Sequence, residues 1–158
     1  MNVFKELWQI VKLMFTSRPK DFNELEILKM NNFPFTGYLA MTWCGKLITR
    51  YPEKIDKQTI THETIHLKQA QNYGSWIAFY LIYIWEWIKG NPIISPMQSA
   101  YYTIPFEVEA YANEDNDNYP NNYTTNNLKT KYNLKDRKNL FKQYGKTRYD
   151  WMKYIKGL

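Results

Sequence analysis

Cysteine is nearly absent from this chain of 158 residues, and no apolar run is long. The single cysteine, Cys44, excludes a disulfide framework within the chain, so nothing in the sequence requires an oxidising compartment. The longest apolar run, Trp76 to Ile88, has thirteen residues and is interrupted only by Glu86. A helix that crosses a bilayer needs about 20. The run therefore predicts either a buried central helix or a segment that dips into a membrane surface.

The N-terminus lacks the features of a secretory signal peptide. Lys5, Glu6 and Lys12 interrupt the apolar residues of segment 1–15, and no small-residue cleavage site follows. The apolar residues recur at helical spacing, which predicts an amphipathic helix. Such a helix packs on its own core, on a membrane surface or on a partner, and the first is the commonest arrangement. We therefore expect a cytoplasmic protein, with peripheral contact at the inner face of the membrane left open.

The positive charge of the chain is concentrated in its last part. Segment 128–158 carries ten Lys or Arg and two Asp, whereas the remainder of the chain is slightly acidic. A basic tail of this kind can meet phosphates or anionic lipid. No nucleic-acid-binding motif accompanies the charge, so we do not expect a nucleic-acid partner. Before the tail, segment 113–127 is rich in Asn and predicts a flexible loop.

Both histidines of the chain fall in one motif, His62-Glu63-Thr64-Ile65-His66. Residues four apart share a helix face, so the two imidazoles can converge on one ion. The neighbouring carboxylate of Glu63 can act as a base on a metal-bound water. The alternative is a pair of surface histidines on a polar helix. The spacing predicts a zinc site with one Zn²⁺ per chain and His62 and His66 as ligands.

A catalytic zinc site uses three protein ligands, and the sequence offers three acidic candidates for the third. Glu107 opens a segment that is predicted to be helical after Pro105. Glu109 lies two residues further on, roughly on the opposite side of that helix, so the two cannot bind one ion together. Glu86 lies in the apolar segment, where an unpaired carboxylate would be costly. Residue types alone leave the choice open.

The elements around the motif can be predicted from local signals. Segment 37–50 predicts a β-hairpin with Cys44-Gly45 at its turn. The motif helix is expected to begin near Asp56 or Thr59 and to end at Gly74. Segment 21–30 is expected to form a short helix or turn, 91–96 a loop, and the tail one or two further helices. Together these indicate one α+β domain, mainly α, with a small hairpin or sheet beside the motif helix.

The strings ITHETIHLKQAQ, FYLIYIWEW and IPFEVEAYANE resemble small bacterial proteins of the HExxH type that are related to the gluzincin metallopeptidases. The resemblance covers about residues 35–116. It implies a zincin-like fold over 1–158, with Glu107 as the third zinc ligand, because Glu107 and Ala110 match the E-x-x-A motif of the family. Tyr111 stands where the family has an Asp that orients a histidine.

That resemblance also implies an activity, the hydrolysis of peptide bonds in a peptide or protein substrate. Zinc-bound water would be the nucleophile and Glu63 the general base. Donors available for the developing oxyanion are Tyr101, Tyr102, Tyr111 and Arg148. Two other functions stay open: a catalytically silent zinc-binding protein, and a membrane-surface interaction protein held by its amphipathic helix, aromatic segment and basic tail.

Overall fold

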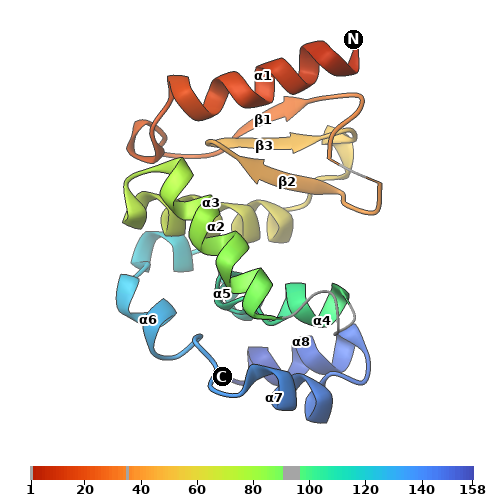
Figure 1. The fold of residues 1–158 in the computed structure, drawn as a ribbon, viewed down its shortest axis with the longest axis vertical. Coiled ribbons are helices and arrows are strands. Elements are labelled where there is room, and N and C mark those ends of the chain that lie inside the picture. Colours follow the sequence, from red (N-terminus) through yellow and green to blue (C-terminus); the bar gives the residue numbers. More distant parts are fainter. Residues whose placement is uncertain (1, 35, 91–96) are drawn as a thin grey trace. The chain divides into compact units, whose positions relative to one another are not determined.

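The computed structural model describes residues 2–34, 36–90 and 97–158 (Figure 1). It is mainly helical with one small sheet, which is the α+β class that the sequence predicts. We expected a single domain. Contacts within the chain divide it into two compact units, Met1–Phe79 and Tyr80–Leu158, and the single domain stays a prediction. The loop predicted for 91–96 lies outside the described residues.

The first unit contains a three-stranded sheet of β1 (Glu26–Lys29), β2 (Ala40–Trp43) and β3 (Lys46–Thr49), in the order β1-β3-β2. β2 and β3 form the predicted antiparallel hairpin. Its two turn residues, Cys44 and Gly45, both have positive φ (49° and 78°), as a two-residue hairpin turn of this hand requires.

The expected short helix or turn in segment 21–30 is wrong. Four of its residues form β1, which pairs with β3 in parallel, so that Leu28 lies opposite Ile48. The amide of Met30 continues this pairing by donating to the carbonyl of Thr49 (3.0 Å). Strand pairing over some twenty residues of sequence, rather than local propensity, decides the conformation here.

Helix α1 (Val3–Thr16) covers one face of this sheet, and α2 (Lys57–Tyr73) lies on the other (Figure 1). Ile10 of α1 packs in a buried cluster with Met30, Phe33 and Ile48. The indole of Trp43 donates to the carbonyl of Ile10 (2.9 Å), which fixes the helix on the sheet. Two short 3-10 turns, Pro19–Asp21 and Pro52–Lys54, connect these elements.

Glu6 is the one acidic residue of α1, and its side chain is fully buried. The carboxylate accepts hydrogen bonds from the backbone amides of Asn31 (2.8 Å) and Asn32 (2.9 Å) and from the Asn32 side chain (3.0 Å). Burial alone would raise the pKa of Glu6, but these hydrogen bonds outweigh it and hold the pKa below its usual value. An ionised Glu6 thus anchors the turn after β1.

Helix α3 (Trp76–Lys89) forms where the apolar run predicts a helix. It is not buried all round: Trp76 and Phe79 are enclosed, whereas Ile77, Leu81, Ile84, Trp85 and Ile88 are exposed. The prediction of a buried central helix is therefore wrong for the face of α3 that carries these five exposed residues. Within the described ranges, no helix combines the length and the apolar character needed to cross a membrane.

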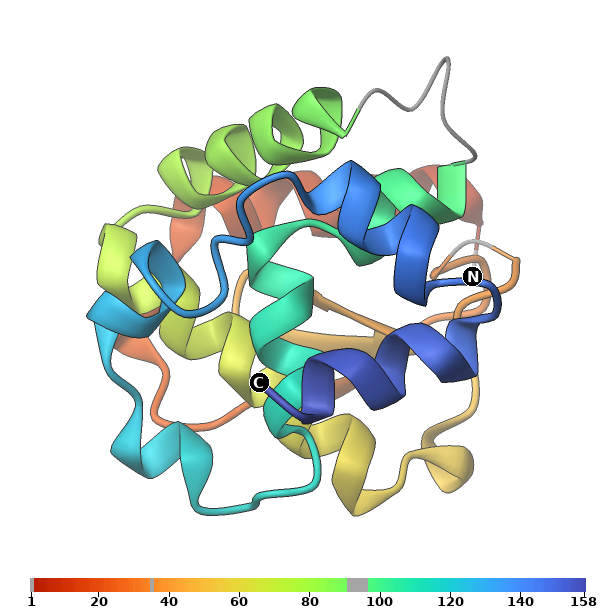
Figure 2. The same ribbon diagram turned by 90° about the horizontal axis from the view of Figure 1, so that it is seen from below.

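The second unit contains the remaining helices, which are α4 (Met97–Tyr102), α5 (Pro105–Asn113), α6 (Thr125–Lys129), α7 (Arg137–Tyr144) and α8 (Arg148–Lys156). α5 and α8 lie side by side (Figure 2). Val108 of α5 shares a buried cluster with Tyr132, Trp151 and Ile155. The basic tail thus supplies three of the four buried residues of this cluster and forms the predicted final helices.

The Asn-rich segment 113–127 contains regular structure where we expected a loop. It includes a 3-10 turn, Tyr119–Asn122, and most of α6. Pro120 is buried, and the Tyr119 hydroxyl donates to Glu109 (2.8 Å). A few tertiary contacts therefore order a segment that carries little apolar surface of its own.

Candidate metal centre

Helix α2, which carries both histidines of the motif, has well-defined ends. The side chain of Asp56 caps its first turn by accepting from the amide of Thr59 (2.8 Å). Gly74 ends it with φ of 68°, in the left-handed conformation that favours glycine at this position. Both ends are as predicted. Four-residue spacing places His62 and His66 on one face, and each side chain is buried.

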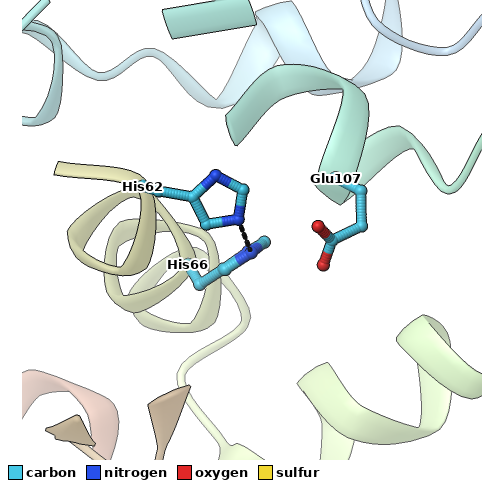
Figure 3. Close-up of side chains that lie close together, drawn as sticks. All are labelled: His62, His66 and Glu107. Atoms are coloured by element: carbon cyan, nitrogen blue, oxygen red, sulfur yellow. Dashed lines mark hydrogen bonds between the residues drawn. The ribbon is translucent and has the colours of Figure 1, made fainter. Parts of the chain in front are cut away.

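The two imidazoles face each other through the nitrogens that would bind a metal (Figure 3). The Nε2 atoms of His62 and His66 are 3.2 Å apart, and the rings meet edge to face. Two nitrogens bound at the usual zinc distance in a tetrahedral site are about 3.3 Å apart. The spacing of this pair therefore fits zinc.

Gln69 is a hydrogen-bond partner that orients the ring of His66. Its side-chain oxygen lies 2.7 Å from Nδ1 of His66, and Gln69 is fully buried. An amide oxygen only accepts, so the proton of a neutral His66 is placed on Nδ1 and the lone pair on Nε2. Sequence reasoning missed Gln69. Its position three residues after His66, on the same helix face, is the signal that could have found it.

Glu63, the predicted general base, lies beside His62 on α2 and is half-buried. Its backbone carbonyl accepts a hydrogen bond from the hydroxyl of Thr42 in β2 (3.3 Å). This hydrogen bond joins the hairpin to the motif helix at Glu63. In the part of the chain that the structure describes, β2 pairs with β3 and with no other strand, so it lies at an edge of the sheet.

Glu107 lies in the first turn of α5 and is 2% exposed. The positive end of the helix dipole favours a negative charge at this position. The hydroxyl of Tyr83 donates to its Oε1 atom (2.6 Å). Burial, and then the charge of Glu107, raise the pKa of the Tyr83 phenol well above its usual value, so Tyr83 remains a protonated donor. No motif or spacing in the sequence points to Tyr83.

His62, His66 and Glu107 each offer one ligand atom, and these three atoms all lie within 4.8 Å of one another (Figure 3). The other two acidic candidates have different partners. Glu109 accepts from Tyr119, and Glu86 forms an ion pair with Arg137 (2.9 Å) and another with Lys89 (2.5 Å). Two imidazoles and one carboxylate are a donor set typical of catalytic zinc.

The four predicted oxyanion donors lie together in the second unit. The Arg148 guanidinium stacks over the rings of Tyr102 (5.5 Å) and Tyr111 (5.7 Å), and Tyr101 contacts Tyr102 edge to face. Burial, and then the charge of Glu107, raise the pKa of Tyr111 as well, so its hydroxyl keeps its proton. The Asp expected by the resemblance at position 111 is thus replaced by a neutral donor.

A scan of family models, a search of curated proteins and a search of solved structures each returned no match. The resemblance to gluzincins stays a prediction.

Proposed function

We propose that this protein is a zinc-dependent metallopeptidase with a minimal gluzincin-like, zincin-like fold. His62, His66 and Glu107 would hold one Zn²⁺, and Glu63 would act as general base. The observation that carries the proposal is the convergence of these three buried side chains, whose ligand atoms lie within 4.8 Å of one another.

The donor set favours zinc among the common ions. Imidazole nitrogen with one carboxylate suits a borderline-soft metal, whereas Mg²⁺ and Ca²⁺ prefer oxygen ligands. Three protein ligands leave one position for water or substrate. When bound, the ion would polarise the scissile carbonyl and lower the pKa of water.

The residues of the chain then have separate roles. Glu63 takes the proton of the attacking water and returns it to the leaving amine. Gln69 and Tyr83 orient His66 and Glu107, respectively, as hydrogen-bond partners of ligands commonly do. As an edge strand of the described sheet, β2 offers an extended peptide a strand to pair with, beside the helix that carries Glu63.

Zinc content tests the ligand set. Protein purified without added metal should contain about one zinc per chain, and His62→Ala, His66→Ala and Glu107→Gln should lose it. Glu109→Gln is the matched control, because it changes an equally buried carboxylate two residues away. Loss of zinc from Glu109→Gln but not from Glu107→Gln would assign the third ligand to Glu109 and refute this set.

Turnover tests the reaction. Glu63→Gln should retain zinc and lose cleavage of a peptide library by two orders of magnitude or more, within the range that a general base contributes. Cleavage by this variant at the wild-type rate would refute the mechanism. Zinc-loaded wild-type protein that cleaves no peptide in the library would favour the silent zinc-binding alternative.

A further inference from the structure

The outer face of α1 carries a stripe of exposed apolar side chains. Phe4, Trp8 and Phe15 are 74%, 70% and 73% exposed. The full set of exposed apolar residues on this helix is Val3, Phe4, Leu7, Trp8, Val11 and Phe15. At 100° per residue these positions form one continuous face. Large rings at such exposure form a patch rather than scattered surface residues.

The helix cannot turn this stripe inward, because residues on its other side already make buried contacts and hydrogen bonds. Ile10 belongs to the core cluster, and its carbonyl accepts from Trp43. Glu6, on the same side, accepts the amides of Asn31 and Asn32. Rotation would expose Ile10 and leave two backbone amides without their acceptor. The apolar stripe therefore faces outward as part of the native fold.

The charges of α1 indicate which surface fits the stripe. Glu6, its only acid, is buried, so the exposed charges of the helix are Lys5 and Lys12. Seven residues apart, these two lysines follow one border of the stripe. A helix with Trp, Phe and Leu on one face and lysines at the border is the pattern of helices that lie in a membrane interface.

We propose that α1 docks the protein on an anionic membrane surface, with the apolar stripe at the level of the headgroups and Lys5 and Lys12 beside lipid phosphates. The unit that carries α1, residues 1–79, holds ten Lys or Arg and seven Asp or Glu, and this net charge of +3 favours a negatively charged surface and opposes pairing with a second copy through this face. This inference is independent of the zinc site.

Vesicle flotation of the full chain tests the proposal, with phosphatidylcholine alone or mixed with phosphatidylglycerol. Wild-type protein should float with the mixed vesicles, and tenfold less with neutral vesicles or in 0.5 M salt. The double variant Phe4→Ser/Trp8→Ser should lose at least tenfold in bound fraction, and Lys5→Gln/Lys12→Gln should lose the preference for anionic lipid. Failure of the wild-type protein to float with the anionic vesicles would overturn the proposal.

Two controls make the test specific. Tyr149→Ser removes an aromatic side chain that is equally exposed (74%) on α8, and it should bind as wild type does. His62→Ala should also bind vesicles normally, which separates docking from zinc binding. Equal binding by Tyr149→Ser and Phe4→Ser/Trp8→Ser would overturn the proposal. So would a wild-type dimer, seen by light scattering, that only Phe4→Ser/Trp8→Ser dissociates, because the stripe would then be a contact between copies.

Discussion

Replacing Gln69 with Leu should weaken zinc binding although it removes no ligand. In the zinc-bound state, Nε2 of His66 must carry a lone pair, so the proton stays on Nδ1, 2.7 Å from the Gln69 oxygen. Leu cannot accept this hydrogen bond. The metal-free protein can relax by moving the proton to the other nitrogen, whereas the metal-bound protein cannot.

The expected loss of zinc affinity follows from this difference between the metal-free and the metal-bound protein. Leaving a buried donor without an acceptor costs about 1–3 kcal/mol. Loss of a hydrogen-bond partner of a ligand typically lowers metal affinity by about 10- to 100-fold, which corresponds to about 1.4–2.8 kcal/mol. Competition with a chromophoric chelator measures this directly. Gln69→Glu should bind zinc at least as tightly as wild type, because a carboxylate is a stronger acceptor.

Gln71→Leu is the matched control for this experiment. The Gln71 side chain donates to the carbonyls of Pro19 (3.3 Å) and Phe22 (2.7 Å), so its loss should lower stability without changing the orientation of His66. We expect its zinc affinity to stay within about twofold of wild type. Unchanged affinity in Gln69→Leu, or an equal loss in Gln71→Leu, would refute the reasoning.

Three further outcomes are expected. Tyr83→Phe should lower zinc affinity about tenfold, measured by the same competition, because Glu107 loses a donor at 2.6 Å; an unchanged affinity would count against Tyr83 as an orienting residue. Glu6→Gln should lower the free energy of unfolding by about 1.5–3 kcal/mol in urea titrations at pH 7. The pKa of Glu6 is lowered in the folded state. Its stabilising effect is therefore present above the usual glutamate pKa of about 4.3 and is lost as the pH falls through the folded-state pKa. In Glu6→Gln, this part of the loss of stability at acid pH should be missing. Gly74→Ala should cost about 1–2 kcal/mol from backbone strain alone, since a Cβ there meets no atom within 4 Å; a stabilised variant in urea would contradict the left-handed assignment.

Local signals predicted the frame of the candidate site well. Asp56 and Gly74 mark the ends of α2, Cys44-Gly45 marks the hairpin turn, and Pro105 marks the start of α5. Each is a residue whose conformational preference acts within a few positions. The ends of the motif helix and of its neighbouring elements can therefore be predicted from the sequence.

Features that depend on distant pairing were missed. β1 exists because β3 lies beside it, and Tyr83 meets Glu107 across twenty-four residues. The periodicity of α1 correctly indicated an amphipathic helix but not the direction of its apolar side, because the buried position of Glu6 depends on amides at residues 31 and 32. Periodicity defines a face, and tertiary contacts decide what that face meets.

The position of Gln69 on the same helix as the histidines has a further consequence. The hydrogen-bond partner that favours one tautomer of His66 lies one turn away on the same helix. Zinc affinity should then follow the integrity of that helix. A change at its capped ends, such as at Asp56 or Gly74, would alter metal occupancy without touching a ligand, so the stability of one helix would set how much zinc the protein retains when zinc is scarce.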